Sequence, residues 1–407
     1  MDRIIFHADC NNFFASCECL ERPELKHVPM AVAGDPEKRV GIVVAKNEIA
    51  KKYGVKTTDT VQQAQRKCPG IVFVPPRHHF YKQISDRVNE IYCEYTDYVE
   101  PASIDESYLD MTDAVRAQKC SAEMLADALR ARVKREIGIT ISVGVSFCKV
   151  FAKMGSDYKK PDATTVITRD NYKQILWPLP VSDLLFAGKA AAATLNKHYI
   201  MTIGDLAQKD QTAVTALLGK QGTQLWCYAN GIDDEPVRLF GDNPEIKSVS
   251  RGRTFARDLV SESDVQTGLS VLSDEVARAL RHEGKKGAVI EVQIRRPDMT
   301  TISRQTSLPH HTYLQREIQT VAFQLVKDNW MIGPSQPIRA LTVSVLKLVS
   351  LEDEIEQISL FDTENEKRSR QDKLEQVVDD LRKKHGIDVI RLGSQENREI
   401  GITRRED

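Results

Sequence analysis

The sequence predicts an α+β protein with several domains, and three observations support this. Its 407 residues are more than one simple hydrophobic core accommodates, which favours about two to four domains. Short apolar strands alternate with helical segments over residues 1–165, and a helix-rich stretch follows over 166–235. A second region with both strands and helices extends over 248–350.

Composition places the chain among ordinary globular proteins. Hydrophobic residues make up 41% and charged residues 28%. We find no apolar run long enough to span a bilayer and no signal-peptide core at the N-terminus, so we expect a cytoplasmic protein with no membrane contact. The net charge of −1 excludes a protein that is basic overall, but local basic surfaces can still bind nucleic acid.

The eight cysteines are scattered and form no C-x-x-C pair. This spacing supports neither a zinc ribbon nor a redox motif. Reduced and mostly buried thiols are the better interpretation.

Acidic residues end or interrupt two strands of the first region. The apolar strand 4–8 leads to Asp9, and a strand-like run near residue 100 contains Asp105 and Glu106. Neighbouring side chains on a regular strand point to opposite faces, so this pair serves one site only at a hairpin tip or a bulge. Three such carboxylates suit Mg²⁺ or Mn²⁺. Solvated turn charges are the alternative interpretation of an isolated Asp-Glu pair.

The remaining elements of the first region follow from periodicity and turn residues. We expect strands at 28–34, 41–45, 71–74 and 139–146, and helices at 13–20, 46–55, 60–68, from 77, from 122 and from 149. His78 and His79 are neighbours on a helix and do not share a face, so they indicate no metal site.

Two segments together resemble the Y-family, or translesion, DNA polymerases. The first is Asp9 followed by Asn11-Asn12-Phe13-Phe14-Ala15, and the second is Ser103-Ile104-Asp105-Glu106-Ser107-Tyr108-Leu109-Asp110. The likeness covers about residues 1–361 and points to the bacterial DNA polymerase IV branch, with some features of DNA polymerase V.

The resemblance implies a right-hand polymerase fold, which periodicity alone would not establish. A ferredoxin-like palm would comprise 1–11 and 77–165, with small fingers at 12–76. A helical thumb with a helix-hairpin-helix would occupy 166–235, and a linker 236–247. An α/β little-finger domain would occupy 248–350, and 351–407 would form a C-terminal tail.

The resemblance also implies roles for individual residues. Asp9, Asp105 and Glu106, with the backbone carbonyl of Cys10, would hold two Mg²⁺ ions, for which Mn²⁺ can substitute. Phe14 would be the steric gate that excludes the 2′-hydroxyl of the incoming nucleotide. Phe13 would pack in the core beside the nucleotide, and Lys160 would contact the triphosphate.

A second triphosphate contact remains open between two lysines. The DNA polymerase IV pattern points to Lys51, whereas the similarity of 45–51 to DNA polymerase V points to Lys46. A lysine is a point charge and cannot grip phosphate as a bidentate fork.

Contacts with DNA are expected in the thumb and little finger. Gly188 and Lys189 would present a helix-hairpin-helix turn to a phosphate. Residues 248–350 carry 14 Lys or Arg against 10 Asp or Glu, which suits duplex binding independent of sequence. The arginines expected to contribute most are Arg251, Arg253, Arg295 and Arg296.

The acidic tail contains a peptide that resembles the sliding-clamp motif of bacterial polymerases. Leu360 and Phe361 would fill an apolar pocket of the clamp, and Gln357 would hydrogen-bond at its rim. Core packing of a short strand is the alternative. We assign no purpose to the helix expected at 373–385.

Together these features predict template-directed, low-fidelity DNA synthesis past damaged bases by two-metal nucleotidyl transfer. The expected partners are primer–template DNA, dNTP and the sliding clamp, and the expected state is a monomer. The alternatives are a nucleotidyl cyclase on a similar palm and a non-catalytic DNA-binding scaffold.

Overall fold

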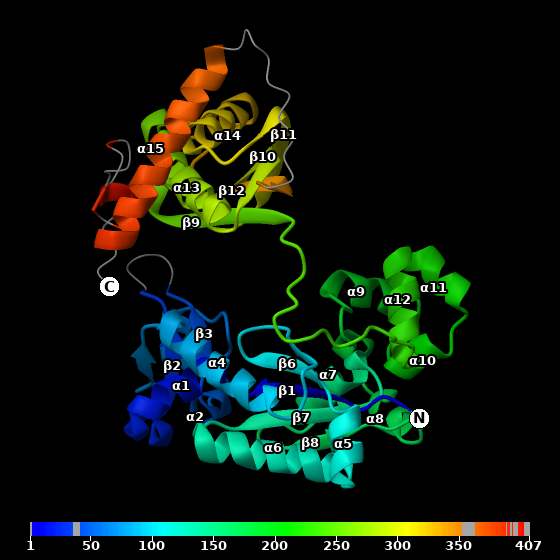
Figure 1. The fold of residues 1–407 in the computed structure, drawn as a ribbon. Helices are drawn as coiled ribbons and strands as arrows, with labels where there is room; N and C mark the ends of the chain where they lie inside the picture. Colours follow the sequence, from blue (N-terminus) through cyan, green and yellow to red (C-terminus); the bar gives the residue numbers. More distant parts are fainter. Residues whose placement is uncertain are drawn as a thin grey trace. The chain divides into compact units, whose positions relative to one another are not determined.

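The computed structural model describes residues 2–35, 41–351, 363–387, 389–390, 393 and 398–402. The chain divides into two compact units (Figure 1). The first comprises Met1–Gly34 and Ile42–Asn243, and the second contains Pro244–Asp407.

Two sheets form the framework of the first unit. A five-stranded sheet has the order β5-β6-β1-β7-β8, and a three-stranded sheet has the order β3-β2-β4. All neighbours in the larger sheet are antiparallel except β7 and β8. The strands are β1 Ile5–Cys10, β2 Met30–Ala33, β3 Val43–Lys46, β4 Val72–Val74, β5 Val99–Pro101, β6 Glu106–Asp110, β7 Ile141–Ser146 and β8 Thr164–Val166.

Helices lie on both faces of the larger sheet, which agrees with the alternation that the sequence predicts. Helices α4 and α6 share a hydrophobic core with one face, and α7 packs against the other. The helical elements in this part are α1 Phe13–Glu21, η1 Pro23–His27, α2 Glu48–Lys52, α3 Val61–Lys67, α4 His78–Cys93, α5 Thr112–Gln118, α6 Ala122–Glu136 and α7 Lys149–Tyr158.

Strand β1 is buried along its whole length because both of its faces are covered. Phe6, Ala8 and Cys10 belong to the core with α4 and α6. The alternate residues point to the α7 side, where Ile5 packs on Ala152. A polar side chain on this second face of β1 therefore lies in the interior rather than in solvent.

Helix α7 lies unusually close to the sheet because of Gly144. This glycine is opposite His7 on the neighbouring strand. A Cβ atom placed on it would lie 1.9 Å from the carbonyl oxygen of Ala152 and 2.4 Å from the amide nitrogen of Ser156. The missing side chain therefore lets the α7 backbone rest directly on the sheet.

Short helices form the remainder of the first unit, as the sequence predicts. They share one hydrophobic core with Phe151, in the first turn of α7, and with Phe147, which lies just before that helix. The helices are α8 Tyr172–Leu176, η3 Val181–Asp183, α9 Lys189–Lys197, α10 Ile203–Ala207, α11 Gln211–Leu218 and α12 Lys220–Ala229.

The expected linker 236–247 is partly packed against the first unit. Val237 is buried with Ile5 and Ala152. The Arg238 amide donates to Glu100 at 3.0 Å, and the Phe240 amide donates to the carbonyl of Asp97 at 2.9 Å. The first unit accordingly extends to Asn243, further than composition suggested.

The second unit is a four-stranded antiparallel sheet with the order β11-β10-β12-β9. Its strands are β9 Ser248–Leu259, β10 Lys285–Arg295, β11 Thr301–Thr312 and β12 Ile338–Ser350. Two helices, α13 Glu262–His282 and α14 Gln315–Asn329, cover one face and form the core with it.

The segment expected as a separate tail after residue 350 contributes to this second unit. Helix α15, Thr363–His385, docks through charged residues rather than an apolar stripe, which explains why hydropathy did not reveal the contact. Arg281 of α13 pairs with Glu375 and with Asp379 at 2.6 Å, and Arg382 pairs with Asp274 at 3.0 Å. Ile400, in the short helix η5 Arg398–Ile400, is buried in the same core.

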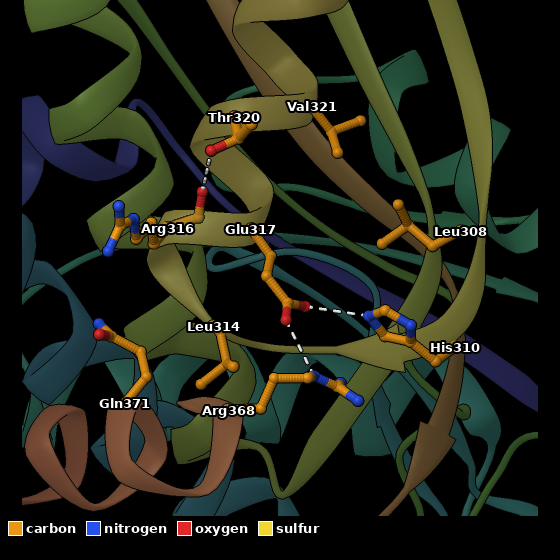
Figure 2. A pocket seen from close by; sticks show the side chains of 9 residues that line it. All are labelled: Leu308, His310, Leu314, Arg316, Glu317, Thr320, Val321, Arg368 and Gln371. Atoms are coloured by element: carbon orange, nitrogen blue, oxygen red, sulfur yellow. Dashed lines mark hydrogen bonds and ion pairs between the residues drawn. The ribbon is translucent and has the colours of Figure 1, made fainter. Parts of the chain in front are cut away.

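A cavity of about 390 Å³ lies between β11, α14 and α15 (Figure 2). In this cavity the Glu317 carboxylate accepts from His310 Nε2 at 3.2 Å and from Arg368 Nε at 2.9 Å. Leu308 and Val321 form its apolar wall. Among the helices of the described ranges, none has both the length and the apolar content needed to cross a bilayer.

Candidate active site

Two acids predicted to share a site lie directly opposite each other. Asp9 near the end of β1 pairs in register with Glu106 at the start of β6. Residues opposite each other on antiparallel strands project to the same face. Both side chains therefore lie on the face that α7 covers.

The third acid lies in the turn that joins β5 to β6, as the argument from strand geometry predicts. The backbone oxygen of Asp105 accepts from the Cys10 amide at 2.9 Å, which fixes the turn against the end of β1. The Asp105 carboxylate accepts from the Ser103 hydroxyl at 2.7 Å.

One cavity of about 270 Å³ brings together all the residues predicted to bind metal or nucleotide except Lys51. The acids line it with both phenylalanines and two lysines. The full set is Asp9, Cys10, Asn12, Phe13, Phe14, Val44, Ala45, Lys46, Thr57, Ile104, Asp105, Glu106 and Lys160.

Two ammonium groups are the immediate partners of the acids. Lys160 Nζ lies 2.5 Å from Asp9 Oδ2, as expected for a residue of the site. Lys153 of α7 was not predicted, yet its Nζ lies 2.7 Å from Glu106 Oε1 and 3.2 Å from Asp9 Oδ2. Asp157 pairs with both lysines, at 3.2 Å from Lys153 and 2.8 Å from Lys160.

Burial and these contacts compete, and the pKa values of Asp9 and Glu106 shift in opposite directions. Burial raises the pKa of Asp9, although Lys160 and Lys153 oppose the effect. His7 and then Lys153 hold the pKa of Glu106 below its usual range against the effect of burial. Burial disfavours charge on Lys153, but the carboxylates of Glu106, Asp9 and Asp157 together outweigh this and raise the pKa of that lysine.

A second residue that the sequence argument missed lies beneath the acids. His7 is completely buried on the same face of β1 as Asp9. Its Nδ1 lies 2.8 Å from the Ser156 hydroxyl, and its Nε2 lies 3.6 Å from Glu106 Oε2. Burial lowers the pKa of His7, so the ring is neutral near pH 7.

Phe14, the residue predicted as the steric gate, stacks against a second aromatic ring. The rings of Phe14 and Tyr81 lie 4.3 Å apart and nearly parallel. The Tyr81 hydroxyl donates to Glu18 at 2.7 Å, and Arg77 donates to the same carboxylate at 2.9 Å. Phe13 is buried in the palm core, as expected.

The structure favours one of the two candidate triphosphate lysines. Lys46 lines the cavity, where its Nζ donates to Thr57 at 3.2 Å. Burial and then the nearby charge of Lys51 lower the pKa of Lys46. Lys51 is not among the cavity-lining residues, and its Nζ lies 3.4 Å from Glu48.

The donor set suits a hard divalent cation. Three residues with carboxylate side chains, Asp9, Asp105 and Glu106, line the cavity. Burial raises the pKa of the Cys10 thiol far above its usual range, so only the backbone oxygen of that residue is a candidate ligand. Within the described residues, no three Asp, Glu, His or Cys side chains converge as a complete metal centre. Lys153 and Lys160 instead pair with Asp9.

The predicted phosphate-binding turn of the thumb lies at the start of α9. Gly188 is the N-cap residue of this helix and Lys189 its first residue, and both are exposed. Phe186 has a positive φ of 67°, a conformation that glycine adopts more readily.

The four arginines predicted to contact DNA do not share one face of the sheet. Arg253 lies opposite the buried Leu341, and its guanidinium donates to Glu275 of α13 at 3.0 Å. Arg251 lies on the same side of β9, opposite the buried Val343. Both therefore project toward the helix-covered face.

The other two arginines of this set differ from each other. Arg296 stacks over the Trp330 ring at 4.9 Å. Arg295 alternates with the buried Ile294 and points away from α13 and α14. We call the surface opposite these helices the polar sheet face, and its residues are Ser250, Thr254, Glu291, Gln293, Arg295, Thr301, Ser303, Gln305, Thr342 and Ser344.

The predicted clamp peptide with Gln357, Leu360 and Phe361 lies outside the described residues. Its sequence follows β12 and precedes α15.

Sequence profiles of one family match both units. The impB/mucB/samB family matches residues 8–157, and the C-terminal domain of the same family matches residues 246–360. The chain is 43% identical to DNA polymerase IV of Acetivibrio thermocellus, and the alignment covers 97% of each chain. It is 38% identical to DNA polymerase IV of Clostridium kluyveri, over 97% of this chain and 98% of that one.

A third relative is DNA polymerase IV 1 of Bacillus subtilis, with 35% identity over 99% of this chain and 95% of the relative. Among solved structures, a Y-family DNA polymerase chimera of Dbh and Dpo4 is similar with a TM-score of 0.76. That match covers 85% of this chain and 99% of the chimera at 24% sequence identity, and it establishes the fold.

Proposed function

The chain belongs to the impB/mucB/samB family of Y-family DNA polymerases, and we propose that Asp9, Asp105 and Glu106 are its catalytic acids. It is a DNA-directed DNA polymerase that acts in translesion synthesis, with a palm, fingers, thumb and little finger. Its substrates are primer–template DNA and deoxynucleoside triphosphates.

The pairing of Asp9 with Glu106 across β1 and β6, with Asp105 in the adjoining turn, carries the site assignment. Family membership implies a general dependence on divalent metal ions. The three carboxylates and the Cys10 carbonyl would hold two Mg²⁺ ions, for which Mn²⁺ can substitute. Bound there, the ions would activate the primer 3′-hydroxyl and stabilise charge on the leaving pyrophosphate.

The other residues of the cavity bind and select the nucleotide. Lys160 and Lys46, which both line the cavity, provide positive charge for the triphosphate. Lys51 pairs with Glu48 and does not line the cavity, so it contributes positive charge from further away. Phe14 forms the wall that leaves no room for a 2′-hydroxyl, and its stack on Tyr81 keeps the ring in place.

Contacts with DNA are proposed for two exposed surfaces. The first-turn amides of α9, next to Gly188 and Lys189, point to one backbone phosphate. On the little finger, the polar sheet face offers hydroxyl and amide groups, with Arg295 as a cation. The remaining arginines then contribute mainly to the stability of that domain; they are Arg251, Arg253 and Arg296.

Further proposals rest on sequence alone. Gln357, Leu360 and Phe361 would engage the sliding clamp. Alanine at Leu360 and Phe361 should abolish clamp binding in a pull-down while leaving primer extension without the clamp unchanged. The enzyme would act as a monomer in the cytoplasm.

Primer extension tests the proposal against its rivals. With a primed template, Mg²⁺ and dNTP, the protein should lengthen the primer in the order set by the template. Nucleotidyl cyclases have no need of a thumb or little finger, whereas this chain matches the family through both units. Binding without extension would indicate a non-catalytic scaffold, and a cyclic nucleotide product would indicate a cyclase.

A further inference from the structure

His7 is held rigidly beneath the catalytic acids. Its imidazole is completely buried, and the Tyr108 ring packs against it edge-on at 4.6 Å. On the neighbouring strand its partner is Gly144, where the missing side chain lets α7 close over the ring. The imidazole therefore cannot swing away without moving α7.

One nitrogen of this ring points at a proposed metal ligand. Among the described residues, Nε2 of His7 has no hydrogen-bond partner. Glu106 Oε2 lies 3.6 Å from it, just beyond hydrogen-bond distance. An unpaired buried polar atom costs about 1–3 kcal/mol, so a native structure retains one for a reason. A shift of Glu106 by about half an ångström would bring the two atoms to hydrogen-bond distance.

The other nitrogen controls which tautomer the ring adopts. Nδ1 lies 2.8 Å from the Ser156 hydroxyl, which also lies 2.8 Å from the carbonyl oxygen of Lys153. Ser156 has one proton and can donate it to either acceptor. When it donates to the Lys153 carbonyl, the ring proton is on Nδ1 and Nε2 has none; when it donates to Nδ1, the ring proton is on Nε2 and points at Glu106. The ionised Glu106 carboxylate can only accept a hydrogen bond, so it favours the second arrangement, which Ser156 then holds through Nδ1.

We propose that His7 is a positioning residue whose Nε2–H, fixed by Ser156, orients the Glu106 carboxylate for metal binding. This inference rests on the proposed function. Lys153 holds the other oxygen of the same carboxylate at 2.7 Å, so the two residues grip Glu106 from both sides. Ligands oriented in this way by a second residue lose about 10- to 100-fold in metal affinity when that residue is removed.

Two substitutions separate this role from simple core packing. In His7→Gln the side-chain amide reaches the place of Nε2 and can still donate to Glu106. In His7→Asn the shorter amide reaches only the place of Nδ1 and can still bond to Ser156. Both are polar and smaller than histidine, so both perturb the core, but only His7→Gln retains a donor toward Glu106.

Two measurements test this role. The first is the dissociation constant of Mn²⁺ alone for the full chain, measured by electron paramagnetic resonance. The second is the Mg²⁺ concentration that gives half-maximal primer extension. The Mn²⁺ dissociation constant and this Mg²⁺ concentration should both rise about tenfold in His7→Asn and stay within about twofold of wild type in His7→Gln. Ser156→Ala should raise both about threefold, because the tautomer is no longer fixed. The exposed His282 supplies the control His282→Asn, which should leave both unchanged.

Equal metal affinities in the two His7 variants, with only a lower melting temperature, would overturn the inference. If His7→Asn does not fold, unchanged Mn²⁺ affinity in Ser156→Ala would overturn it equally. A wild-type protein that binds Mn²⁺ but extends no primer would instead contradict the proposed function. The two failures are therefore distinguishable.

Discussion

Tyr81 stacks flat against Phe14, and its hydroxyl is bonded to Glu18. Phe14, the proposed gate residue, is thus supported by a buried ring whose own position is fixed by a carboxylate. Aromatic pairs of this kind contribute about 0.5–1.5 kcal/mol beyond their buried area.

Tyr81→Leu should therefore weaken sugar discrimination, because Phe14 can then tilt and admit a 2′-hydroxyl. We expect the preference for dCTP over CTP, measured as the ratio of kcat/KM values, to fall about tenfold, which corresponds to about 1.4 kcal/mol. Tyr81→Phe keeps the ring and should change the ratio by less than about twofold. A ratio unchanged in Tyr81→Leu would show that Phe14 needs no support.

Glu18 should stabilise the fold in a pH-dependent way. Burial alone would raise its pKa, but hydrogen bonds from Arg77, Tyr81 and Arg22 outweigh this, so the folded-state pKa lies below the usual value. A depressed folded pKa contributes stability above the unfolded value of about 4.3, and the contribution is lost as pH falls through the folded pKa.

Glu18→Gln should accordingly lower the free energy of unfolding by about 2 kcal/mol at pH 7 in urea titrations. The difference from wild type should shrink below about pH 4. Glu21 pairs with the same Arg77 at the surface, and Glu21→Gln should cost less than about 0.5 kcal/mol. A difference that persists undiminished at low pH would contradict this assignment.

Gly144→Ala should disturb the site by displacing α7, which carries Lys153. The new Cβ would meet backbone atoms of α7 at 1.9 and 2.4 Å, and backbone cannot rotate away as a side chain can. We expect a loss of about 3 kcal/mol or more in unfolding experiments, together with reduced primer extension. Gly333 has no positive φ, and a Cβ added there would have nothing within 4 Å, so Gly333→Ala should leave stability unchanged.

Arg295 and Arg253 should differ in their effect on DNA binding. Arg295→Ala should weaken duplex binding severalfold and reduce the slope of log affinity against log salt by about one phosphate contact. Arg253→Ala should leave that slope unchanged and lower stability, because Arg253 pairs with Glu275. Fluorescence anisotropy over a range of salt concentrations compares them, and equal slopes would show that the sheet faces are wrongly assigned.

The acids could be predicted from sequence because their geometry is local. A strand ending in Asp9 and an Asp-Glu pair that needs a turn leave few arrangements. Lys153 and His7 could not be predicted in this way, since their roles depend on how closely α7 approaches the sheet. A lysine within the apolar stretch Val150–Met154 was the available signal, because a charge in such a setting needs a partner.

The arginines predicted to contact DNA could not be assigned to a face of the sheet from sequence. Charge counting identified the little finger as basic, but the face on which each arginine lies depends on strand register. A shift of one residue moves a side chain to the other face, and the pairings of β9 and β10 each contain a register irregularity. Helix α15 was missed as part of this unit because ion pairs rather than an apolar stripe attach it.

The central claim is tested most directly by Glu106→Gln, assayed for primer extension with Mg²⁺ and for binding to the same primer–template DNA. The glutamine keeps the size of the side chain and removes its charge. We predict that extension falls at least about a thousandfold while the dissociation constant for DNA changes by less than about threefold. Extension at an undiminished rate in Glu106→Gln would contradict the assignment of the active site.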